Sequence, residues 1–92
     1  MSFEWDETKR AENIRDRQID FRDVLDLFDS PESVVFEDDR KDYGEPRFIL
    51  LGPFRDKLYQ VVFTPRGDNI RIISVRRANK RERRLYDNLR DH

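Results

Sequence analysis

The sequence predicts an α+β domain in which helices pack on one face of a single antiparallel sheet of about four to five strands. Apolar side chains recur at helical spacing within the first 30 residues and again near the C-terminus. Between these regions, apolar runs of strand length follow one another through short polar connections, which is typical of an antiparallel meander. With 92 residues, the chain has room for one small domain, residues 1–92.

Two helices are expected before the main strands. Residues 3–5 alternate apolar and polar side chains, as in a short edge strand. Asp6 is placed to cap a helix over about residues 7–17, whose apolar face is thin. Asp20 is placed to cap a second helix, which ends before Pro31. The apolar face of this second helix comprises Phe21, Val24, Leu25 and Phe28.

Four strands and a final helix are expected after residue 33. The strands are expected at 34–37, 47–51, 58–64 and 70–75, with a loop over 38–44, a strand end at Gly52-Pro53 and a turn at 66–69. On the last strand, regular alternation predicts one face with Ile70, Ile72, Ser74 and Arg76 and another with Arg71, Ile73 and Val75. Asn79 is placed to cap the final helix, with Glu82 as its capping-box partner. The apolar stripe of that helix is Leu85, Tyr86 and Leu89.

Composition excludes several kinds of chemistry. The chain has no Cys, which excludes disulfides, thiolate metal sites and a Cys nucleophile. Its only His is the last residue, His92, a position unsuited to catalysis or metal binding. No apolar run approaches the roughly 20 residues that span a bilayer, and the N-terminus lacks the order of a signal peptide. We therefore expect a cytoplasmic protein with no membrane contact, no metal and no cofactor.

Charge is divided unevenly along the chain. Residues 1–45 carry 15 acidic and 7 basic side chains, whereas residues 46–92 carry 5 acidic and 12 basic ones. Most of the bases are Arg, whose planar fork suits phosphate and carboxylate oxygens better than the point charge of Lys. The second half is therefore a candidate phosphate-binding surface. The alternative is that acidic side chains of the first half neutralise it in the fold.

An ordered series of short motifs resembles the BrnT toxin family. The first motifs are Phe3-Glu4-Trp5-Asp6-Glu7 with Lys9 and Asn13, Asp20-Phe21 with Val24, Phe28-Asp29, and Gly44-Glu45-Pro46-Arg47. The later motifs are Leu51-Gly52, Val61-Val62-Phe63-Thr64 with Arg66, Ile70-Arg71-Ile72-Ile73-Ser74 with Arg76, and Ala78 with Glu82-Arg83 and Tyr86. No single motif is specific, but together they span nearly the whole chain in the order of the family.

The resemblance implies a small ribonuclease toxin of a bacterial type II toxin–antitoxin system, with a RelE-like fold. It implies RNA as substrate, neutralisation by an antitoxin resembling BrnA, and contact with operator DNA only through that antitoxin. A homodimer within the toxin–antitoxin complex is a further expectation. Members of the family usually carry Lys-His-Gly after the first helix, where this chain has Asp16-Arg17-Gln18. Either a catalytic His has been lost, or the triplet only turns the chain between helices.

Without a usable His, metal-independent attack of a 2′-hydroxyl on the adjacent phosphate depends on Arg, carboxylate and Tyr side chains. Arginines stabilise the charge that develops on the phosphorane. The expected catalytic residues are Glu45, Arg47, Arg66 and Arg76. The general base is sought in Glu45 or Glu82 with a raised pKa, or in Tyr86 with a lowered pKa. The expected substrate-binding residues are Thr64, Arg77, Lys80, Arg81 and Tyr86.

Structural roles compete with these functional ones. Arg47 is equally suited to a surface ion pair, Glu82 to a helix cap, and Tyr86 to core packing. Two other functions also stay open. One is a catalytically inactive, toxin-like module that binds an antitoxin or nucleic acid, which the change at residues 16–18 favours. The other is an interaction protein whose Arg-rich face meets an acidic partner.

Overall fold

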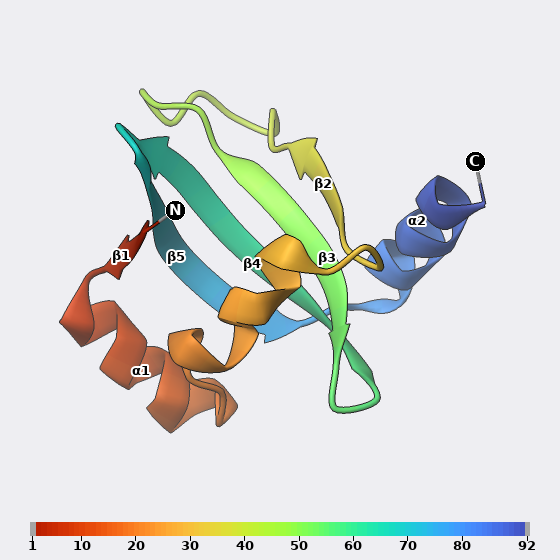
Figure 1. The fold of residues 1–92 in the computed structure, drawn as a ribbon, viewed down its shortest axis with the longest axis horizontal. Helices are drawn as coiled ribbons and strands as arrows, with labels where there is room; N and C mark the ends of the chain where they lie inside the picture. The colour runs from red at the N-terminus through yellow and green to blue at the C-terminus, as the bar shows by residue number, and fades with distance from the viewer. Residues whose placement is uncertain (1, 92) are drawn as a thin grey trace.

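In a computed structural model, which describes residues 2–91, the chain forms one five-stranded sheet with helices on both of its sides (Figure 1). The elements are β1 (Ser2–Trp5), α1 (Glu7–Arg17), the 3-10 helix η1 (Phe21–Asp29), β2 (Val34–Glu37), β3 (Phe48–Phe54), β4 (Lys57–Arg66), β5 (Asn69–Arg77) and α2 (Lys80–Arg90). The order of the strands in the sheet is β1-β5-β4-β3-β2. No helix among residues 2–91 is long and apolar enough to cross a membrane.

The sheet is mixed, so the prediction of a purely antiparallel sheet is wrong. Strands β2 to β5 form the expected antiparallel meander. The first strand, β1, instead pairs in parallel with β5, with Trp5 opposite Ile72. Hairpin connections can be recognised locally, because they are short. The pairing of β1 with β5 joins residues more than 60 positions apart, and no local signal sets its direction.

The two faces of the sheet carry separate apolar cores, so the helices do not all pack on one face as predicted. On one face, η1 packs against β3, β4 and β5; this core comprises Ile19, Phe21, Val24, Leu27, Leu50, Val61, Phe63, Ile72 and Val75. On the other, the α2 face, Tyr86 packs with a core of Ile49, Leu51, Val62 and Ala78. Strands β3 and β4 are apolar on both faces, and each face therefore needs cover.

Helix α1 covers an edge of the sheet and is attached mainly through polar contacts. The side chain of Asn13 is buried; its Oδ1 accepts from the Val75 amide at 3.3 Å, and its Nδ2 donates to the Ile19 carbonyl at 3.0 Å. Arg17 donates to the Val75 carbonyl at 3.3 Å. Ile14, on the thin apolar face, stays exposed. These contacts satisfy backbone groups on the edge of β5 that faces away from β4, beyond the end of β1.

The predicted helix caps are confirmed. The Asp6 side chain accepts from the Thr8 amide at the start of α1. Asp20 forms a capping box at the start of η1, and Asn79 forms one with Glu82 at the start of α2. Each cap depends on contacts between residues at most three positions apart, so the sequence alone was sufficient to place it.

Strand β3 continues through Gly52 and Pro53, where the sequence predicted its end. Strand β2 pairs with β3 only as far as Leu51, so beyond that point the missing N–H of Pro53 leaves no ladder bond unmade on that side. A side chain at position 52 would bring its Cβ to 2.5 Å from the Ser33 Oγ. Both residues therefore serve the packing of the strand.

A bulge in β5 changes which side chains share a face. Val62 pairs with Ser74 and Phe63 pairs with Ile72, which leaves Ile73 as the extra residue. Ile72 and Val75 consequently both lie in the core beneath η1, while Ile73 packs into the core beneath α2. The regular alternation predicted for this strand holds through Ile73 and is wrong from Ser74 onward.

Candidate functional site

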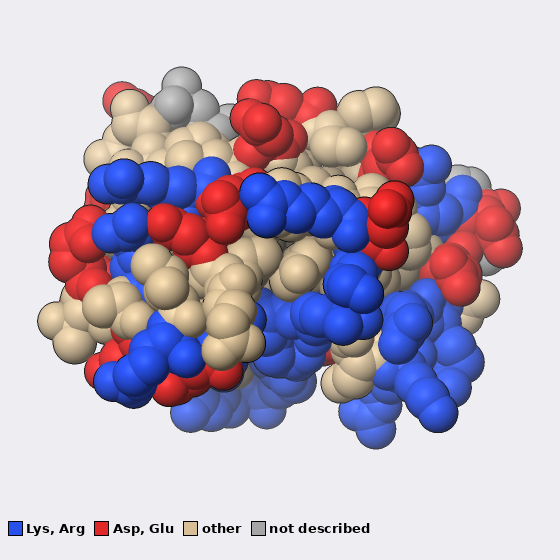
Figure 2. Space-filling model, turned by 90° about the horizontal axis from the view of Figure 1, so that it is seen from below, with Lys and Arg blue, Asp and Glu red and all other residues tan. Residues whose placement is uncertain are grey.

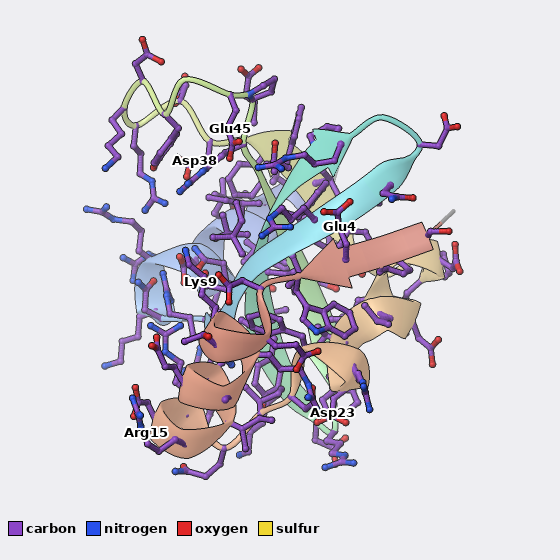
Figure 3. The ribbon with its side chains drawn as sticks, turned by 90° about the vertical axis from the view of Figure 1, so that its left-hand side faces the viewer. Glu4, Lys9, Arg15, Asp23, Asp38 and Glu45 are labelled. Carbon is purple, nitrogen blue, oxygen red and sulfur yellow. The ribbon has the colours of Figure 1, made fainter. Side chains whose placement is uncertain are left out.

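A row of polar side chains crosses the α2 face beyond the apolar patch that α2 covers. Glu4 of β1 lies opposite Arg71 of β5, and Arg71 lies opposite Thr64 of β4. Arg47 precedes β3 by one residue, and its carbonyl accepts from the Asp38 amide at 2.8 Å. Side chains on one face of neighbouring strands lie about 5 Å apart. The sheet therefore places these residues in one row across this face. Figure 3 labels Glu4 and Asp38, which lie at the two ends of the row.

Glu45 lies between two arginines at this edge of the sheet. One carboxylate oxygen, Oε1, is 3.5 Å from Arg66 Nη2, and the other, Oε2, is 3.6 Å from Arg47 Nε. The Arg47 guanidinium also lies over the Tyr43 ring, 4.1 Å from its centroid. Within residues 2–91, the buried Nε of Arg47 has no hydrogen-bond partner. The structure thus brings together three of the four predicted catalytic residues.

Hydrogen bonds hold the loop that carries Glu45 and Arg47 in place. Thr64 is only 1% exposed, and its hydroxyl donates to the Pro46 carbonyl, so it positions this loop and is out of reach of RNA. Tyr43 donates from its hydroxyl to Asp38 at 3.1 Å. Hydrogen bonds from Arg40 hold the pKa of Asp38 at about 2. The sequence predicted residues 38–44 only as a polar loop, because the spacing of Asp38, Tyr43 and Thr64 carries no known signal.

Glu45, Arg47 and Arg66 form the Glu45 cluster, and Arg76 does not join it. It lies on the same face but pairs with Gln60, about 20 Å along β4 from Arg66. Its guanidinium makes two hydrogen bonds to Glu82, at 2.9 and 2.8 Å. Burial alone would raise the pKa of Glu82, but the bonds from Arg76 and the Asn79 amide outweigh it, and the pKa is lowered. The prediction of Glu82 as a base with a raised pKa is therefore wrong.

Tyr86 is also not the base with a lowered pKa that the sequence suggested. Burial raises the pKa of its hydroxyl, which donates to the Glu32 carbonyl. Tyr86 and Arg77 line a cavity of about 510 Å³ between α2 and the turn that joins β3 to β4. Arg81 and Arg76 line a different cavity, of about 250 Å³, near the end of β2. The candidate substrate-binding residues are therefore divided between two sites, and Lys80 lines neither of them.

The triplet at residues 16–18 ends α1. Gln18 has φ 56° and ψ 33°, the left-handed conformation that glycine adopts most easily, and its amide bonds to the Ile14 carbonyl. Arg17 lines a notch of about 200 Å³ between α1 and β5, together with Lys9 and Ser74. The geometry fits the interpretation that the triplet turns the chain between α1 and η1.

Basic side chains gather toward the α2 end of the molecule, whereas acidic and basic side chains alternate over the opposite end (Figure 2). Exposed basic residues there include these five: Arg77, Lys80, Arg81, Arg83 and Arg84. None of the five forms an ion pair within the described part of the chain. Residues 2–91 also contain no group of three or more His, Cys, Asp or Glu arranged to hold a metal ion. His92 lies outside the described residues.

Comparison with known families matches residues 5–82 to the family described as "Ribonuclease toxin, BrnT, of type II toxin-antitoxin system". The chain belongs to the BrnT family. The matched range includes the row of polar residues except Glu4, and it includes the whole Glu45 cluster, whereas Tyr86 lies beyond it. A search of curated proteins found no match. Membership in this family connects the chain with RNA as a target and with an antitoxin as a partner.

Proposed function

We propose that this BrnT chain is an endoribonuclease that cleaves RNA without a metal and is neutralised by an antitoxin resembling BrnA. The observation that carries the proposal is the position of Glu45 between Arg47 and Arg66, on the part of the sheet that α2 leaves uncovered. Family membership supports the same reaction class. A carboxylate flanked by two guanidinium groups offers both a proton acceptor and a phosphate clamp.

In the proposed reaction the 2′-hydroxyl of RNA attacks the adjacent phosphorus, which yields a 2′,3′-cyclic phosphate and frees the 5′ oxygen. Arg47 and Arg66 donate to the non-bridging oxygens, and these bonds strengthen as the phosphorane gains negative charge. A Glu45 oxygen accepts the 2′ proton. The cations beside Glu45 are arginines, which hold their protons tightly. The leaving 5′ oxygen therefore takes its proton from water, a weak acid, and we expect a slow enzyme.

Two predicted site residues take supporting roles in this proposal. Thr64 holds the loop of Glu45 and Arg47 through its bond to Pro46. Arg76 fixes the start of α2 through Glu82, which is itself held by Gln60 at 2.7 Å. Both residues position other groups and are not expected to touch the reacting phosphate.

The proposal is tested with purified protein and a short RNA in the presence of a metal chelator. We expect cleavage by the unaltered chain and a fall in rate of about 10²-fold or more in Glu45→Gln, Arg47→Ala and Arg66→Ala. Arg22→Ala removes an exposed arginine from η1 and is the matched control. Rates that fall no further than in this control, with all proteins folded, would exclude the Glu45 cluster as the active site.

A catalytically inactive module is the second candidate. It is favoured by the contact of Arg17 with the Val75 carbonyl, because the position where relatives usually carry His is occupied here by a structural side chain. This alternative predicts salt-sensitive RNA binding with no cleaved product. It also predicts that Arg17→His restores no cleavage. Induction of the chain in bacteria, followed by mapping of RNA ends, separates the two candidates, because only the enzyme produces new ends.

A further inference from the structure

A pocket of about 250 Å³ adjoins the Glu45 cluster between β2, the residues that follow it and the start of α2. Its apolar lining comprises Phe36, Ile49 and Leu85. Ile49 is buried, whereas Leu85 remains 38% exposed, so part of this apolar surface faces solvent. An apolar surface that no residue in 2–91 covers suits a flat, uncharged ligand group.

The charges around this pocket disfavour an anion. Its lining includes four carboxylates and three guanidinium groups. Two of the arginines already neutralise two of the carboxylates. Arg40 bonds to Asp38 at 2.8 and 2.9 Å, and Arg76 bonds to Glu82 at 2.9 and 2.8 Å. Glu37 lies on the opposite face of β2 from Phe36, so the remaining charges are those of Asp39 and Arg81, and a phosphate or an acidic peptide would meet no excess of positive charge here. An uncharged group that both donates and accepts hydrogen bonds is the better match.

The same two pairs also present flat surfaces. A guanidinium that makes two parallel bonds to one carboxylate is held in a fixed plane. Arg40 and Arg76 both line the pocket. Unstacked RNA bases stack on such planes and on aromatic rings. The pocket thus combines an apolar lining with two rigid platforms for a planar ring.

Two charged groups at the pocket remain available for recognition. Arg81 and Asp39 are exposed and form no ion pair within the described residues. Arginine donates to the O6 and N7 acceptors of guanine, and a carboxylate accepts from the amino group of that base. Guanine is the base that offers two bonds to each group at once, from O6 and N7 to the guanidinium and from the N1 and N2 hydrogens to the carboxylate.

The pocket lies next to the proposed phosphate clamp. Asp38, in the pocket lining, donates from its amide to the carbonyl of Arg47 at 2.8 Å. Tyr43 bridges the two regions, because its hydroxyl bonds to Asp38 and its ring lies beneath the Arg47 guanidinium. We propose that this pocket binds an unstacked base of the RNA substrate, with guanine preferred, next to the phosphate held at Arg47 and Arg66. The inference rests on the proposed function for the nature of its ligand.

The test measures binding of four 2′-O-methyl RNA pentamers, UUGUU, UUAUU, UUCUU and UUUUU, at one fixed salt concentration. Methylation blocks cleavage, so binding is measured independently of activity. We expect the pentamer with guanine to bind roughly tenfold more tightly than the others. Arg81→Ala should abolish this preference. Arg84→Ala removes an exposed arginine from the same helix that does not line the pocket, and it should weaken all four pentamers alike.

The outcomes separate the pocket from the reaction. Equal binding of the four pentamers, or equal effects of Arg81→Ala and Arg84→Ala, would overturn the base pocket even if the chain cleaves RNA. A guanine preference that depends on Arg81, in a chain that cleaves no RNA, would support the pocket and reject the proposed enzyme. Absence of binding to every pentamer overturns the pocket as well.

Discussion

Gln18 holds a backbone conformation that glycine adopts with less strain. Its φ of 56° places the Cβ against the following carbonyl, which costs a non-glycine residue about 1–2 kcal/mol. Relatives that carry Gly at this position avoid that strain. The replacement at residue 18 therefore affects the stability of the turn between α1 and η1, and it bears on catalysis only through the position of Arg17.

We predict that Gln18→Gly raises the free energy of unfolding by about 0.5–1 kcal/mol, because the relief of strain exceeds the added entropy of the unfolded chain. Urea denaturation measures the change. Gln18→Ala keeps the Cβ and is the control, for which no gain is expected. A glycine variant no more stable than the alanine variant would contradict the proposed strain.

Asp38 and Asp20 link the stability of the fold to pH. Hydrogen bonds from Arg40 and Arg10 respectively lower the pKa of each carboxyl from 3.8 to about 2. A lowered pKa stabilises the fold above the unfolded value near 4, and this stabilisation disappears as the pH falls toward 2. We predict a loss on the order of 1–2 kcal/mol per group between pH 5 and pH 2.

Urea midpoints measured across this pH range test the prediction. Asp38→Asn should be less stable than the unaltered chain at pH 6 and should lose less stability on acidification. Asp39→Asn changes the exposed neighbour and should leave both values unchanged. If the acid response of Asp38→Asn equals that of the unaltered chain, Asp38 is not one of the linked groups.

At the scale of elements, the sequence predicted what depends on neighbours in the chain. The caps at Asp6, Asp20 and Asn79 and the positions of all eight elements follow from local spacing. Contacts distant in sequence were not predictable: the parallel partner of β1, the bulge at Ile73 and the second face of the sheet. The same limit applies to the candidate site. The contact of Glu45 with Arg47 could be predicted because the two are near neighbours in sequence, whereas the contact of Arg76 with Glu82 depends on where α2 docks.

The attachment of α1 illustrates this limit and yields a prediction. The sequence offered only a thin apolar face on this helix and no partner for it, and the side chain that docks it is Asn13. We predict that Asn13→Ala lowers the free energy of unfolding by about 2–3 kcal/mol, because it leaves the Val75 amide and the Ile19 carbonyl buried without partners. Glu12→Ala, an exposed neighbour on the same helix, should change stability by less than about 0.5 kcal/mol.

Hydrogen exchange provides the second measurement for α1. In Asn13→Ala the Val75 amide should exchange faster than in the unaltered chain, while amides within the β3–β4 ladder keep their relative protection. A stability loss spread evenly over all amides would instead mean that α1 unfolds only together with the sheet.

At the scale of the whole molecule, the acidic first half neutralises only part of the basic second half. Of eight ion pairs within residues 2–91, three join the two halves, and they use only Glu45 and Glu4. These pairs lie on the polar row and at the proposed clamp. The arginines of α2 are not among them, so the positive charge near that helix remains available to a polyanion.

This distribution of charge predicts how RNA binding responds to salt. Each phosphate contact of a single strand contributes about 0.7 to the slope of log affinity against log salt concentration. If Arg83 and Arg84 of α2 contact phosphates, the double variant Arg83→Ala/Arg84→Ala should lower the slope by about 1.4. Arg15→Ala/Arg22→Ala removes the same charge from α1 and η1, at the opposite end of the fold, and should leave the slope unchanged. Equal slopes in the two double variants would show that RNA binding responds only to the net charge of the protein. If Arg83→Ala/Arg84→Ala lost binding to an acidic protein but kept its binding to RNA, the interaction-protein alternative would be favoured.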